Sequence, residues 1–499
     1  MRVSRLTERM WLRLSSRLIA GGLGGMALAA ALVQIGLGVK LGVLLLALFG
    51  AATGLLGFAW LGAFNLGAWW VLFYVLGNVL IALFAKTLLG QALDSHLDAP
   101  YASYLALAVG CLALLFALML AWLAPVGKPI LRASEEPGLL RFMAWGCFGV
   151  GLFFWYVNRR FQDPNGSGFG GLSVFGDLLF MAVIARTAFV LVQSQGRKRL
   201  DRVLVLFLVT SILAGLINNA KTQVALPVVS YFSTVLFFQR GLPRREVLLI
   251  AAGGMLFVSL VGPMIHAYRA LGIQQVSLDR KIALIGQGIA AVAEHGEFDY
   301  YEHLANEQFQ GDNYYGYFGG ARGQMILGRY ASIQQIAPVV AAVEHQGPVG
   351  GFAVWPAFER LAPKIIAPHK PENVESFNIL VRLGLISPYG GKFPTLPLVG
   401  QAYAAYGMIG LCVIPFLAFL AFALVIKKIG WDLYRNIYAI FFLCDFVVVY
   451  ANQGDLGQYA GAVLRGFPLF VVTFLILARL HRSLRKRGLG RNYLQRAQG

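Results

Sequence analysis

Residues 398–426 read LVGQAYAAYGMIGLCVIPFLAFLAFALVI and contain no charged side chain. A stretch of this length exceeds the ~20 apolar residues that an α-helix needs to cross ~30 Å of hydrocarbon. Backbone N–H and C=O groups left unpaired in lipid would cost several kcal/mol each, so such a stretch must be helical. Residues 398–426 therefore predict a membrane-spanning helix.

Similar composition extends over most of the chain, of which 58% is hydrophobic and 13% charged. The apolar runs predict an all-α integral membrane protein with about twelve spans, and a count of eleven to thirteen is compatible with the short interruptions. The four cysteines lie inside apolar runs without a CxxC pair, so no disulfide framework is expected. The expected spans are 18–39, 41–63, 67–87, 103–125, 140–158, 172–194, 200–218, 222–239, 246–268, 398–426, 435–452 and 461–480.

Lys and Arg residues are distributed unevenly between alternate loops. One set of loops, which includes both termini, holds 25 of them, whereas the opposite short loops hold six. Cytoplasmic loops are the ones enriched in Lys and Arg. We therefore expect a bacterial inner-membrane protein with both termini cytoplasmic, and we attribute the net charge of +19 to topology and anionic lipid and not to nucleic acid. The first apolar run is too long for a cleaved signal peptide.

This topology predicts three regions along the chain. Residues 1–268 form a membrane domain with spans 1–9, residues 269–397 a long periplasmic loop, and residues 398–499 a membrane domain with spans 10–12 and a basic tail. Because one very long loop lies away from the midpoint and no internal repeat is found, a transporter of two matched halves is disfavoured.

The long loop combines helical periodicity with a segment rich in aromatic and amide side chains. Residues 281–298 and 328–345 predict helices that lie along the membrane surface. Residues 294–323, EHGEFDYYEHLANEQFQGDNYYGYFGGARG, offer aromatic faces beside amides and carboxylates. That combination suits sugar rings, although a solvated amphipathic segment explains it equally well.

A proline-punctuated stretch, APKIIAPHKPENVESF, follows at residues 362–377. Prolines restrict the backbone and hold the neighbouring cations Lys364, His369 and Lys370 close together. Several cations at a membrane surface suit an anionic lipid head group such as a diphosphate, and ordinary loop charges are the alternative interpretation.

The order of these features resembles the Wzy-type O-antigen and exopolysaccharide repeat-unit polymerases, over roughly residues 200–425. Members often carry Arg where this chain has Lys221 and Lys364, and Glu where it has Gln401, which cannot act as a general base. The matching residues are Lys221 in NNAKTQVALP, Tyr268 and Arg269 after span 9, Arg329 and Tyr330 opening a loop helix, the proline-lysine segment 363–371, and the entry Gly400, Gln401, Tyr403, Tyr406 and Gly407.

The resemblance implies a membrane glycosyltransferase of GT-C-like architecture. Such an enzyme transfers a growing glycan from undecaprenyl diphosphate to the terminal sugar of an incoming lipid-linked repeat unit. The implied diphosphate-binding residues are Lys221, Arg269, Arg329, Lys364 and Lys370, with secondary substrate-binding residues Arg159, Arg160, Arg322 and Tyr403. The candidate general bases are His345, His369 and Glu375.

We expect no cofactor and no metal. Glu294, His295, Glu302 and His303 are close in sequence, but their spacing matches no metal signature. The expected partners are the undecaprenyl-diphosphate-linked oligosaccharide, membrane lipids, and a chain-length regulator and flippase of the same pathway, with no nucleic acid.

Three other functions fit the same sequence. An O-antigen ligase would share the topology and the cationic loop. A lipid-linked oligosaccharide flippase would rely on charges within the spans, where Asp177, Arg186 and Asp445 lie. A non-enzymatic assembly scaffold would tolerate the loss of every loop cation.

Overall fold

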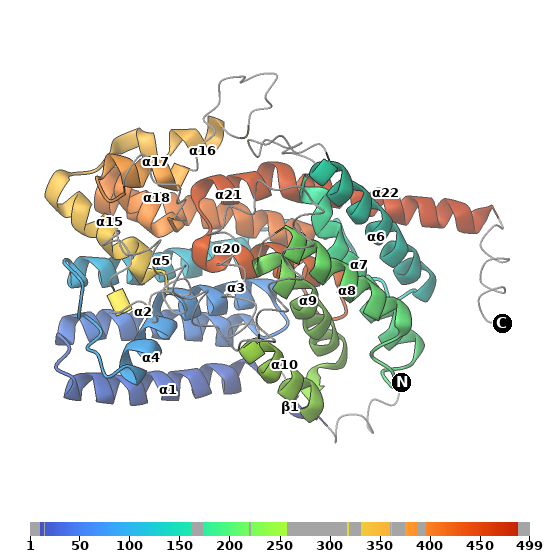
Figure 1. The fold of residues 1–499 in the computed structure, drawn as a ribbon, viewed down its shortest axis with the longest axis horizontal. Helices are drawn as coiled ribbons and strands as arrows, with labels where there is room; N and C mark the ends of the chain where they lie inside the picture. Colours follow the sequence, from blue (N-terminus) through green and yellow to red (C-terminus); the bar gives the residue numbers. More distant parts are fainter. Residues whose placement is uncertain are drawn as a thin grey trace, which may run out of the picture.

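The structure is a computed structural model that describes residues 10–13, 15–160, 173–218, 221–256, 317–318, 331–359, 361, 375–386 and 396–487. These residues form a helical bundle with one short two-stranded sheet (Figure 1). Nine of the described helices are long and apolar enough to cross a membrane, and two shorter apolar helices accompany them. The prediction of an all-α membrane protein is thereby confirmed at the level of its class.

The helices follow the predicted spans closely. The first part of the predicted span 246–268 is α10, and the remainder of that span lies outside the described residues. In chain order, the elements of the N-terminal half are β1 (Met10–Arg13), α1 (Ser16–Gly36), α2 (Leu41–Leu61), α3 (Leu66–Val75), η2 (Leu76–Leu80), α4 (Ile81–Leu88), α5 (Pro100–Leu123), α6 (Pro137–Arg160), η3 (Ser173–Asp177), α7 (Leu178–Gln193), α8 (Arg202–Ile217), α9 (Lys221–Gln239), β2 (Gly241–Pro243) and α10 (Arg244–Leu256).

The C-terminal half of the described chain contains shorter pieces as well as long helices. Several of these pieces join end to end, so that α19 to α20 and α21 to α22 each form one interrupted rod. They are α15 (Ile333–Gln346), η7 (Gly350–Ala353), α16 (Trp355–Glu359), α17 (Glu375–Arg382), α18 (Leu398–Ile429), α19 (Ile437–Phe442), η8 (Leu443–Val447), α20 (Val448–Gln453), α21 (Leu456–Gly461), η9 (Ala462–Gly466) and α22 (Phe467–Lys486).

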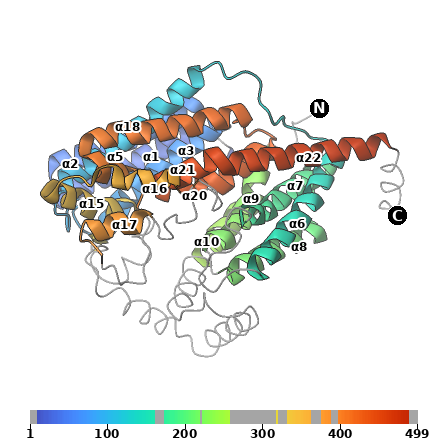
Figure 2. The ribbon, with the colours of Figure 1, turned by 90° about the horizontal axis from the view of Figure 1, so that it is seen from above.

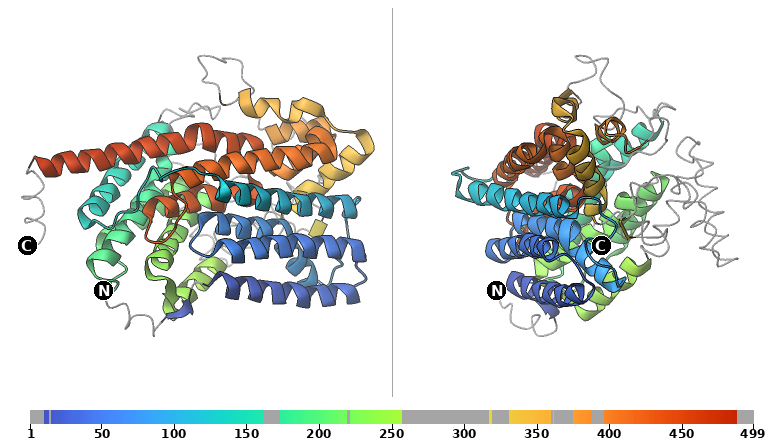
Figure 3. Two further views of the ribbon diagram at one scale, coloured as in Figure 1. Left: turned by 180° about the vertical axis from the view of Figure 1, so that it is seen from behind. Right: turned by 90° about the vertical axis from the view of Figure 1, so that its left-hand side faces the viewer.

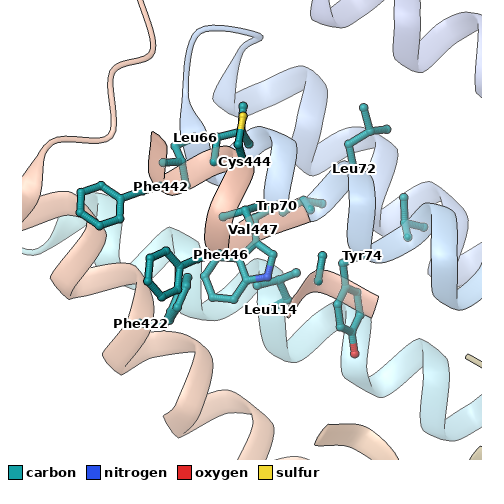
Figure 4. Packing of buried hydrophobic residues seen from close by; sticks show 14 of the residues in the cluster. Leu66, Trp70, Leu72, Tyr74, Leu114, Phe422, Phe442, Cys444, Phe446 and Val447 are labelled. Carbon is teal, nitrogen blue, oxygen red and sulfur yellow. The ribbon is translucent and has the colours of Figure 1, made fainter. Parts of the chain in front are cut away.

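The helices pack in two groups. In the first, α1, α2, α5 and α18 lie side by side, with α15, α16 and α17 gathered at one end near the start of α18 (Figures 1 and 3). The second group, α6 to α9, is inclined to α18 and α22 (Figure 2). Aromatic side chains fill the core of the first group, where the Trp70 ring lies 4.7 Å from that of Phe422 and close to side chains of α5 and η8 (Figure 4).

The loops that are rich in Lys and Arg meet at one end of the bundle. Lys427 donates hydrogen bonds from its ammonium group to three carbonyl oxygens at the end of α5, at 2.7–2.9 Å. The guanidinium of Arg435 contacts the carboxylate of Glu135 at 2.8 Å, and β1 pairs antiparallel with β2. The charge pattern therefore grouped loops that do lie together in space.

Helix α18 is broken inside the segment that predicted the fold. Gly407 has φ 59°, a left-handed conformation that a residue with a Cβ adopts only with strain. The break frees the carbonyl of Ala404, which accepts a hydrogen bond from the Val349 N–H at 2.8 Å. The glycine-rich entry of this span thus serves to dock the turn between α15 and η7.

One of the two predicted loop helices is described, and its environment differs from expectation. Residues 328–345 predict a helix on the membrane surface, but α15 is buried along nearly its whole length between α5 and α18. The polar residues Gln334 and Gln335 made the segment look amphipathic, yet both side chains face the protein interior. The other predicted helix, residues 281–298, lies outside the described residues.

Tyr317 and Phe318 anchor the long loop in the first helix group. Tyr317 is 3% exposed and donates a hydrogen bond to the carbonyl of Leu93 at 2.9 Å, while its hydroxyl oxygen lies 2.9 Å from that of Tyr104. The ammonium of Lys86 lies 4.3 Å from the centre of the Tyr317 ring. Burial raises the pKa of the Tyr317 hydroxyl, which therefore stays protonated as a donor.

We expect Tyr317→Phe to loosen this anchor. The substitution keeps the ring but leaves the carbonyl of Leu93 and the hydroxyl of Tyr104 without their partner, a loss of ~1–3 kcal/mol for buried groups. Thermal unfolding of the detergent-purified protein should show a lower Tm. Tyr156→Phe, at an exposed tyrosine, is the control and should leave the Tm unchanged. Equal Tm values for both variants would refute the anchoring role.

Candidate functional site

Most of the predicted diphosphate-binding residues cannot be placed by the structure. The diphosphate-binding candidate Lys221 begins α9, and the candidate base Glu375 begins α17. Only the backbone of these two residues is described. Arg159, Arg160, His345 and Tyr403 are described in full. The predicted residues that lie outside the described part of the chain are Arg269, Arg322, Arg329, Lys364, His369 and Lys370.

Arg159 lies beside the turn that leads into Lys221. Its guanidinium donates a hydrogen bond to the side-chain oxygen of Asn218 at 2.6 Å, and the indole of Trp155 donates to the same oxygen at 3.2 Å. The amide of Asn218 in turn donates to Gln223 in the first turn of α9. The structure therefore brings a secondary predicted cation, Arg159, next to the chain position of a primary one, Lys221. The neighbouring Arg160 is exposed.

Gln401 and Tyr403 connect α18 to other elements. The amide of Gln401 donates to the carbonyl of Ala353 at 2.7 Å and accepts from the N–H of Leu456 at 2.8 Å. Tyr403 is 4% exposed and donates its hydroxyl proton to the carboxylate of Glu344. Both side chains hold α15, η7 and α21 against α18. This gives Gln401 a structural reason to be an amide, because it must both donate and accept.

His345, one of the three candidate general bases, lies on the last turn of α15. Its side chain is exposed, and it follows Glu344, which accepts the hydrogen bond from Tyr403. An exposed imidazole at this position is accessible to a substrate, and its neutral form can accept a proton. The structure does not bring it together with Arg159.

Arg186 is explained by an ion pair. Its guanidinium binds the carboxylate of Asp201 through two nitrogens, and one of these contacts is a 3.3 Å hydrogen bond from Nε. Asp201 also caps α8 by accepting from the N–H of Leu204 at 2.8 Å. The charge of Arg186 on α7 is thus paired with an acid at the start of α8. This ion pair explains the charge without a transport path.

Asp177 and Asp445, the two acids inside apolar runs, lie close enough in the structure for their charges to interact. Their carboxylates interact electrostatically, and both also interact with the hydroxyl of Tyr450. Asp445 lies in the π-helical turn η8, and Arg465 lies in η9, which packs against η8 through Phe446. Intramembrane carboxylates are costly and usually functional, and π-helical turns are frequent at functional sites.

The described chain therefore contains two polar groups of functional interest, one around Arg159 and one around Asp445. They lie near each other because α6 packs on α7 and η3, and α7 packs on α9 and α19. The sequence identifies Asp177 and Asp445 as acids inside apolar runs, but it does not show that they are near each other. Within the described residues, no group of three or more His, Cys, Asp or Glu side chains could hold a metal ion.

Comparisons with known proteins found no matching family model, no matching curated protein and no matching solved structure.

Proposed function

We propose that this protein polymerises undecaprenyl-diphosphate-linked oligosaccharide repeat units into O-antigen or exopolysaccharide. The proposal places it in the bacterial inner membrane, with the chemistry on the periplasmic face and both termini in the cytoplasm. The observation that supports it best is the contact of Arg159 with the turn before Lys221. The resemblance assigns Lys221 to substrate binding, and the contact brings Arg159, a secondary candidate, next to the chain position of Lys221 in a helical bundle.

The reaction requires one bond to form as another breaks. A hydroxyl oxygen of the acceptor repeat unit attacks the anomeric carbon of the donor glycan, and the bond from that carbon to the diphosphate oxygen breaks. The diphosphate leaves with the bonding electron pair, and the hydroxyl proton passes to a base. Lys221, Arg269, Arg329, Lys364 and Lys370 stabilise the charge that develops on the diphosphate.

The remaining tasks are proton transfer and alignment of two lipid-borne substrates. His345, His369 and Glu375 are the proposed bases, and their chemistry requires a neutral imidazole or an ionised carboxylate. Binding both substrates with the acceptor hydroxyl next to the anomeric carbon removes their translational freedom, and this alone contributes much of the rate enhancement. The other proposed partners are membrane lipids and the chain-length regulator and flippase of the same pathway.

Deletion of the gene in its own host tests this function. A polymerase mutant should display a single capped repeat unit on a gel of surface glycan, in place of a ladder of long chains. A ligase mutant would display no repeat unit at all. Complementation with the intact gene should restore the ladder, and an unchanged ladder in the deletion strain would refute the proposal.

A second candidate, a lipid-linked oligosaccharide flippase, is favoured by the Asp177 and Asp445 pair. Paired intramembrane carboxylates are a recurrent feature of proton-coupled transporters. A flippase mutant would accumulate lipid-linked repeat units that remain protected from reagents added outside the inner membrane, whereas a polymerase mutant would expose them.

A further inference from the structure

Three irregular backbone segments meet about halfway along the span Leu66–Leu88. The first is the π-helical turn η2, in which Gly77 lies roughly 16 Å from Leu66 at 1.5 Å per helical residue. The second is the break between α20 and α21, and the third is the start of α15. Non-helical backbone at membrane depth persists only where protein buries it or where it lines a polar space.

Direct contacts join the three segments. The N–H of Ser332 donates to the carbonyl of Gly77 at 3.0 Å, and the Ser332 hydroxyl donates to the carbonyl of Asn452 at 3.0 Å. A Cβ at Gly77 would collide with the side-chain amide of Asn452, so any other residue at this position would force that amide to move. Residues 77, 332 and 452 therefore form one packed junction, which we call the amide junction.

Within the part of the chain that the structure describes, several buried polar atoms on residues of the amide junction or next to it in the chain have no hydrogen-bond partner. They are the side-chain oxygens of Asn78 and Asn452 and both polar atoms of Gln334, and the hydroxyl of Tyr74, one helical turn before Asn78, is unpartnered too. Asn78 and Gln334 are each 1% exposed, whereas Asn452 is partly exposed and brings the junction to the surface. An unsatisfied buried polar group costs ~1–3 kcal/mol, and native proteins contain few of them.

The chemistry of these side chains indicates the ligand. The unpartnered groups are amides and a phenol, which carry no charge and together offer both donors and acceptors. A diphosphate would require cations, and a divalent metal ion usually takes at least one carboxylate, thiolate or imidazole ligand in addition to neutral oxygens. Neutral sugar hydroxyls, which also donate and accept, match the set.

We propose that Asn78, Gln334 and Asn452 form a subsite that binds hydroxyl groups of the lipid-linked sugar, with Tyr74 as a further hydroxyl contact. The inference rests on the proposed function and adds to it a place for the carbohydrate, apart from the cations that hold the diphosphate. The unsatisfied amides are retained although they cost stability, because the bound sugar supplies their partners.

The test uses Asn78→Leu and Gln334→Met, which replace amides that have unpartnered atoms with apolar side chains of similar size; the Asn78 nitrogen donates to the carbonyl of Tyr74 at 2.8 Å, and this bond is lost in Asn78→Leu. Each full-length variant is expressed in the deletion strain, its surface glycan is separated on a gel, and the Tm of the purified protein is measured. We expect an unchanged or raised Tm, together with at least a tenfold loss of long chains. Gln193→Met, at an exposed amide on the last turn of α7, should change neither quantity.

Two results would overturn the inference. If both variants restore a full ladder, the amides do not bind the sugar. If the Tm and the ladder fall together, the amides are structural and internal water satisfies them. Failure of the proposed function itself looks different, because the deletion strain would then keep its ladder before any variant is introduced.

Discussion

Alanine at Arg329 or at Lys370 is expected to abolish long-chain glycan while the protein remains folded in the membrane. In the proposed reaction these cations face a diphosphate that gains negative charge as the glycosidic bond breaks. Charge-assisted hydrogen bonds to a leaving group act mainly in the transition state, and loss of one such donor typically costs a factor of ~10²–10³ in rate. At that rate, chain extension would fall below detection on a gel.

The measurement is the glycan ladder of the deletion strain complemented with each variant, alongside immunodetection of the protein in the membrane fraction. Lys486→Ala removes a cation from an exposed position on the last turn of α22 and should leave the ladder intact. Arg329→Lys keeps the charge without the bidentate guanidinium and should restore shorter chains only in part. A normal ladder from Arg329→Ala would remove this residue from the mechanism.

The largest loss of stability is expected from Gly410→Ala. A Cβ at this position would collide with the backbone carbonyl oxygen of Ala402, and it would lie 3.1 Å from the Cβ of Tyr406. Neither obstacle can rotate away, because one is main chain and the other lies at the break in α18. The helix would have to move, which should destabilise the fold by more than ~3 kcal/mol.

Gly25→Ala in α1 is the matched control, since an added Cβ there meets no atom within 4 Å. It should leave the Tm unchanged or raise it slightly, as alanine favours a helix over glycine. Gel filtration and thermal unfolding of both variants in detergent would measure the difference. A Gly410→Ala protein with the Tm of the control would show that the break in α18 is easily remodelled.

The sequence determined the class of the fold because a bilayer imposes local requirements. Length and apolarity identify a spanning helix without reference to its neighbours, so α18 and its counterparts were found with small errors at their ends. The uneven distribution of Lys and Arg grouped the loops that Lys427 and Arg435 connect in the structure. No packing information was needed for either inference.

Charged residues inside the spans were visible in the sequence, but their partners were not. Arg186 pairs with Asp201 fifteen residues later, whereas the charge of Asp177 interacts with that of Asp445 on a distant helix. Both cases look alike in a linear pattern of apolar residues. Only the packing of α7 against α8 and against the α19 rod separates a structural ion pair from a functional candidate.

Tertiary structure alone decided where the irregular and unsatisfied groups lie. The spans are apolar on every side, so periodicity does not say which face of η2 meets α20 or that α15 enters the bundle. The Ser332 contacts with Gly77 and Asn452 join positions far apart in the chain. The π-helical turn η2 is about as apolar as the α-helices beside it, so hydropathy does not reveal it. A spanning helix can be recognised from its own residues, because length and apolarity suffice. Which polar groups meet depends on how the helices pack, and that cannot be read from spans that are apolar on every side.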